Sequence, residues 1–102
     1  MDEVKVIWTT LAIKQRNAIF DYWNNRNKSN RYSIKLNLTI YQKIDLLKSN
    51  PLSDIETNFE PYRILHFENY GLVYRLEKDL LYIISLWDNR QNPSKLKKLL
   101  GL

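Results

Sequence analysis

The sequence has no cysteine, only two glycines and a single histidine, and it has no long hydrophobic run. Without cysteine there is no disulfide framework, no thiolate zinc cluster and no cysteine nucleophile. Two glycines are too few for a glycine-rich phosphate loop. One histidine among scattered carboxylates lacks the ligand spacing of a metal site. The sequence therefore predicts no metal and no cofactor.

No apolar segment approaches the ~20 residues that a membrane-spanning helix needs, and the N-terminus has no signal-peptide pattern. Together with the missing cysteines, this predicts a cytoplasmic protein without membrane contact. The 102 residues, of which 44% are apolar and 13% aromatic, are enough for a single domain over 1–102 with its own core. The net charge of +5 would attract nucleic acid or an acidic protein surface without distinguishing them.

The first quarter of the chain predicts a strand followed by a helix. Apart from Lys5, residues 4–8 are β-branched or aromatic, which is typical of a strand, and Thr9-Thr10 then offers a hydroxyl N-cap. We expect the helix to continue to about Arg26 and to be amphipathic. Its apolar face would comprise Ala12, Ile19, Tyr22 and Trp23.

Residues 34–48 fit two periodicities. An alternating strand pattern is formed by Ile34, Leu36, Leu38 and Ile40. An equally good helical stripe is formed by Leu36, Ile40, Ile44 and Leu47. The segment is longer than most strands, so we predict a helix.

The second half predicts a sheet. Residues 49–61 carry two prolines and no sustained period, which indicates a surface loop. Strands are then expected over 62–67, 70–76 and 80–87, joined by turns so short that neighbours must be antiparallel. The last strand is apolar on both faces, so it should lie inside the sheet and be covered on both sides.

A short final helix is expected after Asn92-Pro93, which suit an N-cap and a first helical residue. Its apolar stripe would consist of Leu96, Leu99 and Leu100. The predicted fold class is therefore α+β: an N-terminal strand, two helices, a three-strand antiparallel meander and a short C-terminal helix.

This order of elements resembles the RelE/ParE family of bacterial toxins over nearly the whole chain. The motifs that carry the resemblance are Tyr62-Arg63-Ile64-Leu65, Tyr70-Gly71-Leu72-Val73-Tyr74-Arg75 and Asp88-Asn89-Arg90-Gln91-Asn92-Pro93. The resemblance implies two helices packed on one face of a twisted sheet, a basic surface on the other, and an antitoxin that wraps the toxin. Ribonuclease members cut mRNA within the ribosome, whereas the ParE branch is associated with DNA gyrase.

Three arginines are the candidate site residues. Arg90 stands where the family places a phosphate-stabilising arginine, and a guanidinium can hold two phosphate oxygens at once. Its alternative role is to cap a turn or to pair with Asp88. Arg63 and Arg75 would add to a cationic face, and the alternative for Arg63 is an arginine at the sheet edge whose stem packs on apolar neighbours.

Two departures count against the nuclease branch. Gly71 and Leu96 occupy the positions where the resemblance places a second catalytic arginine and a catalytic tyrosine, and neither can carry charge or a proton. We expect His66 to be a half-buried packing residue instead of a proton carrier. The leading prediction is thus a toxin nearer the ParE branch, which binds a target such as DNA gyrase and is neutralised in a hetero-oligomer with its antitoxin. The alternatives are a ribosome-dependent mRNA endonuclease, with Arg63, Arg75 and Arg90 on the phosphate, and a non-toxic basic RNA-binding module.

Overall fold

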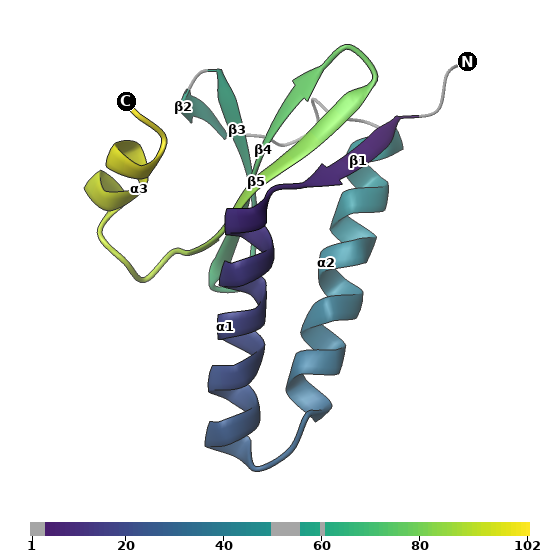
Figure 1. Ribbon diagram of the computed structural model, residues 1–102, viewed down its shortest axis with the longest axis vertical. Coiled ribbons are helices and arrows are strands. Elements are labelled where there is room, and N and C mark those ends of the chain that lie inside the picture. Colours follow the sequence, from purple (N-terminus) through teal and green to yellow (C-terminus); the bar gives the residue numbers. More distant parts are fainter. Residues whose placement is uncertain (1–3, 50–55, 60) are drawn as a thin grey trace.

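The computed structural model describes residues 4–49, 56–59 and 61–102, the second range by its backbone alone. Its elements are β1 (Lys5–Trp8), α1 (Thr10–Asn27), α2 (Arg31–Ser49), β2 (Glu56–Phe59), β3 (Tyr62–Phe67), β4 (Tyr70–Glu77), β5 (Leu80–Asp88) and α3 (Pro93–Leu99). The strands form one sheet, α1 and α2 form a helical hairpin, and α3 lies apart from them (Figure 1). No helix within the described ranges is both long and apolar enough to cross a membrane.

The sheet has the strand order β1-β5-β4-β3-β2. The predicted meander of β3, β4 and β5 is confirmed, because both of its pairings are antiparallel. The N-terminal strand returns to the sheet as a parallel neighbour of β5, with Lys5 opposite Leu80 and Trp8 opposite Ile83. Strand β5 is therefore interior, as its apolar sequence predicts.

The loop predicted for residues 49–61 is wrong over 56–59, which form strand β2 against β3. Glu56 pairs with Ile64 and Phe59 with Tyr62. A short edge strand is held by backbone hydrogen bonds on one side only and needs no sustained apolar period. The pattern that indicated a loop therefore did not exclude a strand. Residues 50–55 of the predicted loop lie outside the described part of the chain.

Helix α1 starts at the predicted hydroxyl cap and is fastened to β5. Thr9 Oγ1 accepts a hydrogen bond from Ala12 N and lies 2.9 and 3.1 Å from the carbonyl oxygens of Ile83 and Ile84. Ile84 is the extra residue at a register shift in the pairing of β4 with β5, between Ile83 and Ser85. Farther along α1, Gln15 Oε1 accepts hydrogen bonds from Leu86 N and Ser85 Oγ. The start of α1 thus provides hydrogen-bond partners for the backbone of β5 where β5 extends past its pairing with β1.

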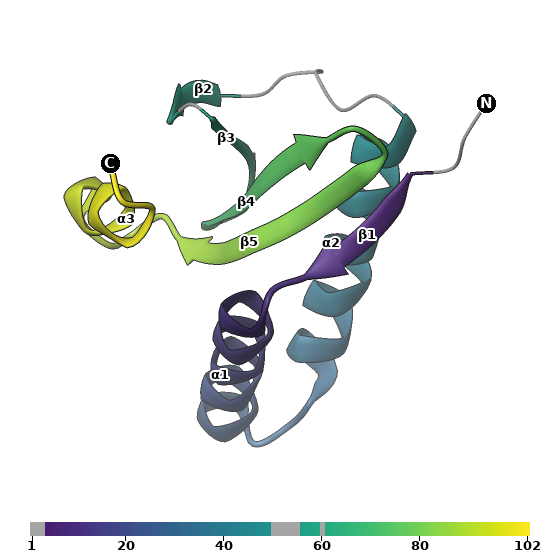
Figure 2. The ribbon, with the colours of Figure 1, turned by 45° about the horizontal axis from the view of Figure 1, so that its top comes forward.

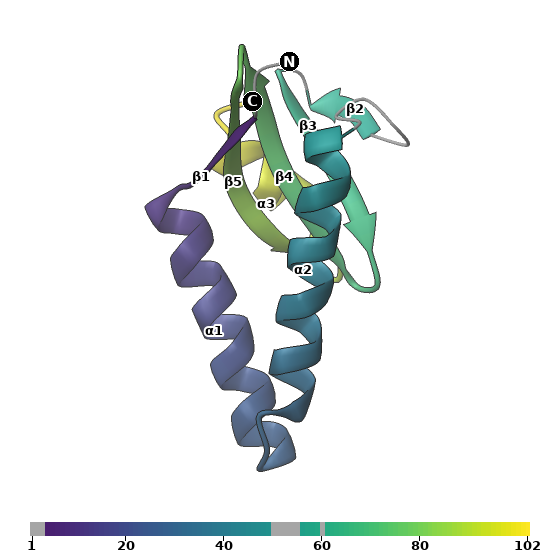
Figure 3. The same cartoon turned by 90° about the vertical axis from the view of Figure 1, so that its right-hand side faces the viewer.

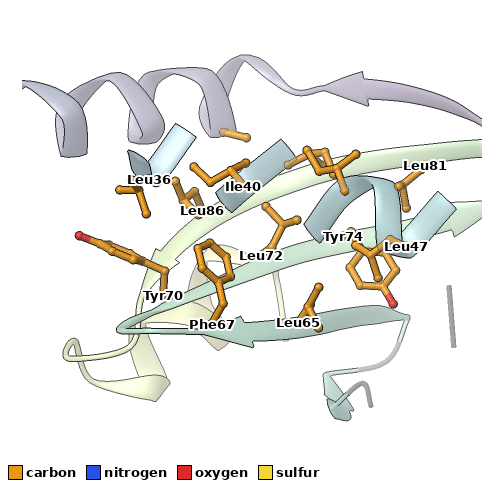
Figure 4. Packing of buried hydrophobic residues seen from close by; sticks show 13 residues of the cluster. Leu36, Ile40, Leu47, Leu65, Phe67, Tyr70, Leu72, Tyr74, Leu81 and Leu86 are labelled. Carbon is orange, nitrogen blue, oxygen red and sulfur yellow. The ribbon is translucent and has the colours of Figure 1, made fainter. Parts of the chain in front are cut away.

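Helix α2 supplies the main core. Its predicted stripe is buried against the sheet, together with Ala12 of α1 (Figure 4). The core residues from the sheet are Leu65, Phe67, Tyr70, Leu72, Tyr74, Leu81, Ile83 and Leu86. The amphipathic face expected for α1 is only partly correct: Ala12 is buried and Ile19 packs on the core, but Tyr22 is exposed. Tyr22 instead lines a hollow together with Asp88 and Arg90, at the end of β5.

Helix α3 lies beside the end of β5 (Figure 2) and packs on part of the sheet face opposite the main core. Asn92 caps it by accepting from Ser94 N, and Pro93 is at its start, as predicted. Leu96 and Leu100 pack with Ile64, Val73 and Trp87 in a second apolar cluster. Leu99, predicted on the same stripe, is exposed, because seven helical residues bury one narrow strip only. The expectation that β5 is covered on both sides is met only near its end, where Trp87 packs under α3, because Leu80, Tyr82 and Ile84 are half-buried.

Candidate functional site

The segment that follows β5 separates two hollows. Asp88 and Arg90 line an open groove of about 360 Å³ beside α1. Asn89, Gln91 and Pro93 line a smaller hollow of about 130 Å³ beside α3. Asp88 and Gln91 also line a third hollow of about 200 Å³ beside α1, so this short segment borders hollows on both sides of the sheet.

We call the hollow beside α1 the aromatic groove; its lining is Ala18, Ile19, Tyr22, Trp23, Tyr70, Asp88 and Arg90. Trp23 Nε1 donates a hydrogen bond of 2.8 Å to Tyr70 Oη. The Trp23 ring also contacts Tyr22 edge-on, with centroids 5.1 Å apart, and Tyr32 at 4.8 Å. Because Tyr70 is buried and hydrogen-bonded, these contacts fix the ring orientations in the groove.

Arg90 is held in one orientation by Asp88. Its Nε and Nη2 donate to the two carboxylate oxygens at 2.9 and 2.7 Å, and its backbone N donates to Oδ1 at 2.9 Å. These hydrogen bonds hold the pKa of Asp88 below its ordinary value and raise that of Arg90. The side chain of Arg90 is still 53% exposed. A guanidinium has five N–H groups, so donors remain for a carboxylate or phosphate of a partner.

Tyr32, which contacts the Trp23 ring, is itself held by a hydrogen bond to the sheet. Its hydroxyl donates to Glu68 Oε2 at 3.2 Å, which links α2 to the turn between β3 and β4. Burial, followed by the charge of Glu68, raises the pKa of Tyr32 above its ordinary value. The tyrosine therefore stays a neutral hydrogen-bond donor at physiological pH.

The three candidate arginines do not converge on one phosphate. Arg63 lies opposite Tyr74 in the β3–β4 register, on the face that the helical hairpin covers. Arg75 lies on the other face and forms a 3.8 Å ion pair with Glu77. Its cross-strand partner on β5, Tyr82, lies six residues before Asp88, which is about 20 Å along a strand. Arg90 is thus the only one of the three at the aromatic groove.

Arg63 also acts on a buried tyrosine. Burial raises the pKa of Tyr74 to about 12, and the charge of Arg63 opposes that shift. A raised pKa in the folded state contributes stability below the unfolded value of about 10, and this contribution disappears as pH rises toward 12. We therefore expect stability to fall between pH 10 and 12 and to fall less in Tyr74→Phe, as measured by urea denaturation at pH 9 and pH 11.5. Equal losses in the two proteins would contradict this account.

The resemblance placed the catalytic side chains of the ribonuclease branch at Gly71 and Leu96; Leu96 lines the hollow beside α3, and Gly71 lies next to its lining residues Ile64 and Asn89. Leu96 is buried in the second apolar cluster. A Cβ at Gly71 would lie 2.9 Å from Ile64 Cγ2 and 3.2 Å from Asn89 Oδ1, so even alanine would require neighbours to move. His66 is exposed, contrary to expectation, and its Nδ1 lies 3.1 Å from Asn89 Nδ2. The described residues contain no cluster of three or more metal-ligating side chains.

The aromatic groove was not predicted from the sequence. The sequence predicted Tyr22 and Trp23 on the apolar face of a helix and Tyr70 at the start of a strand. The groove forms because α1, the start of β4 and the end of β5 meet at one end of the sheet. The available signal was the abundance of aromatics, three Trp and seven Tyr, which exceeds what the core uses.

Comparison with known proteins identifies the family of this chain. The family model described as ParE toxin of type II toxin-antitoxin system, parDE, matches residues 6–93. The chain belongs to the ParE toxin family. It is therefore a toxin of the type II toxin–antitoxin class, and its resemblance to the ParE branch is confirmed. A search of curated proteins finds none that matches.

A solved structure agrees with this assignment at the level of the fold. A chain described as "Chromosomal ParDE TA system from P. aeruginosa" is similar with a TM-score of 0.71 and 17% sequence identity. The similarity covers 84% of this chain and 96% of that chain. The predicted α+β architecture is thus that of a ParE-family protein.

Proposed function

We propose that this ParE-family toxin acts in the bacterial cytoplasm, where it arrests growth by binding a cellular target such as DNA gyrase and does not cleave RNA. A cognate antitoxin neutralises it in a hetero-oligomeric complex. The proposal is carried by the packing on the side of the sheet under α3. There, Leu96 is committed to apolar packing and Gly71 has no room for a side chain.

Cleavage of RNA without a metal needs a base for the 2′-hydroxyl and a group that protonates the leaving oxygen. It also needs cations around the phosphate. Leu96 supplies no proton donor, and the three arginines lie on different faces or at different ends of the sheet. This arrangement supports a binding protein better than a nuclease.

The aromatic groove is the surface we assign to target binding. Its lining includes a cation held in one orientation, Arg90, and the exposed aromatic ring of Tyr22. Arginine and tyrosine are enriched among residues that dominate binding energy at protein interfaces. Replacing Arg90 with alanine should therefore weaken toxicity more than the same change at Arg63 or Arg75.

The proposal is tested by inducing the chain in bacteria without its partner. We expect growth to stop and plasmid supercoiling to change while bulk transcripts stay intact. Co-expression of the cognate antitoxin should restore growth. Arg90→Ala, with Arg63→Ala and Arg75→Ala as matched controls, is scored in the same assay.

Rapid transcript cleavage with normal supercoiling would instead establish the endonuclease alternative. If that cleavage were abolished by Arg90→Ala, the arginine would belong to its active site. Absence of any toxicity, with RNA affinity that falls steeply with salt, would establish the RNA-binding module.

A further inference from the structure

The sheet face that carries α3 has a second half, which lies at the other end of the strands and mixes apolar with charged side chains. Three neighbouring strands contribute two residues each: Lys5 and Ile7 of β1, Leu80 and Tyr82 of β5, and Arg75 and Glu77 of β4. We call this surface the outer patch. Ile7 is 38% exposed, and the side chains of Arg75 and Glu77 are 42% and 54% exposed. Helix α3 packs at the far end of β5 (Figure 2).

The outer patch faces away from the helical hairpin. Its residues alternate along each strand with residues that pack in the main core, such as Val6, Leu76 and Leu81. The hairpin itself extends past the end of the sheet, as Figures 1 and 3 show. A partner bound to the outer patch would therefore leave the hairpin free.

The strand register arranges the six side chains in two rows. In one row Leu80 lies between Lys5 and Glu77. In the next row Tyr82 lies between Ile7 and Arg75. Strands in a sheet are about 4.8 Å apart, so the backbones at Lys5 and Glu77 are roughly 10 Å apart across β5. The first row thus has a cation at one end, an anion at the other and an apolar residue in the middle.

This order of charges is complementary to itself. A two-fold axis that runs between two copies, parallel to β5, places each β5 over its counterpart and exchanges β1 with β4. Lys5 of each copy then faces Glu77 of the other, and the two Leu80 side chains meet at the axis. A contact between identical surfaces needs this self-complementarity. The hairpin lacks it, because residues 10–49 contain eight Lys and Arg against two Asp and would repel a second hairpin.

We propose that the outer patch is the interface of a homodimer in which two sheets pack face to face about this axis. Facing sheets pack about 10 Å apart with their strands within about 30° of each other. Each α3 packs toward the β3 side of its sheet, so the axis places the two α3 helices on opposite sides of the interface. The outer patch is small beside the roughly 20–30 residues a side of a standard interface, so we expect a weak dimer. The inference goes beyond the proposed function and does not depend on it.

Charge reversal tests the arrangement. Sedimentation velocity of the purified toxin over about 1–100 μM covers the range in which a dimer with a micromolar Kd dissociates. Glu77→Lys and Lys5→Glu should each weaken the dimer by roughly tenfold or more, because like charges then face each other at two symmetric contacts. An equimolar mixture of the two variants should form a heterodimer, because opposite charges meet again at both contacts. Lys35→Glu, at an exposed position on α2, is the matched control and should leave the dimer unchanged.

The overall charge of the chain predicts a different pattern. Lys5→Glu removes one positive charge and adds one negative charge, so the net charge falls from +5 to +3. If only overall repulsion mattered, this change would favour association. A dimer strengthened by Lys5→Glu would therefore overturn the facing of Lys5 and Glu77.

The remaining outcomes identify the occupant of the outer patch. Lys5 and Glu77 are exposed, so both variants should keep the melting temperature of the wild type. A wild type that stays monomeric over the whole range would overturn the homodimer, and so would a mixture of the two variants without heterodimer. Loss of antitoxin binding by Glu77→Lys, with unchanged mass and melting temperature, would give the patch to the antitoxin. Loss of toxicity under the same conditions would give it to the target, and either result would overturn the second copy as occupant.

Discussion

Ile40→Ala is expected to lower the free energy of unfolding by about 2–5 kcal/mol, the range for truncating a buried aliphatic side chain. Ile40 is 0% exposed and packs in the core between α2 and the sheet (Figure 4). Its loss removes apolar contacts and leaves a cavity that the surrounding sheet cannot close completely. Urea denaturation monitored by tryptophan fluorescence measures the change.

Leu38→Ala is the matched control for Ile40→Ala. It lies two residues away on the same helix but is 60% exposed, so its replacement should change stability by only about 0.5 kcal/mol. The pair also separates the two periodicities of residues 34–48. A strand would bury Leu38 and Ile40 alike, because residues two apart share a face. Equal losses in the two variants would contradict the helix.

Gly71→Arg/Leu96→Tyr introduces the side-chain types that the resemblance places at these positions in the ribonuclease branch, and we expect a destabilised protein that does not cleave RNA. Each change overpacks a filled region, at a cost of about 1–3 kcal/mol. The Cβ at Gly71 would meet Ile64, which packs with Leu96 in the same cluster, so the two costs need not add. Thermal unfolding and an assay of ribosome-bound transcripts measure the two outcomes.

Val73→Ile is a useful comparison for this variant, because it enlarges the same apolar cluster without adding polar groups. It should also destabilise the fold and leave RNA intact. A Gly71→Arg/Leu96→Tyr protein as stable as the wild type would contradict the packing argument. If that protein cut transcripts, the sheet face under α3 would be a nuclease site that lacks only two side chains.

Local patterns in the sequence were sufficient for most of the fold. The helical stripe of α2 could be distinguished from the competing strand pattern by its length, and the cap and proline at Asn92-Pro93 located α3. Strand β2 could not be predicted, because its pairing with β3 depends on backbone hydrogen bonds that leave no apolar period. Tyr22 was misplaced because helical spacing does not tell which side of a helix the sheet will cover.

The candidate site was predictable only where its contacts are local. The pairing of Arg90 with Asp88 joins residues two apart and was foreseen as one of two roles. The contact of Trp23 with Tyr70 spans 47 residues and depends on how α1 crosses the end of the sheet. The separation of Arg63 from Arg75 depends on strand register, which places their side chains on opposite faces.

We propose that this toxin binds its target and does not cut RNA. The most direct measurement is the supercoiling of relaxed plasmid by purified DNA gyrase, with the purified toxin titrated in, beside a ribosome-bound transcript under the same conditions. The account predicts that supercoiling is inhibited by the wild type, less so by Arg90→Ala, and that the transcript stays intact. Normal supercoiling with a cleaved transcript would contradict it.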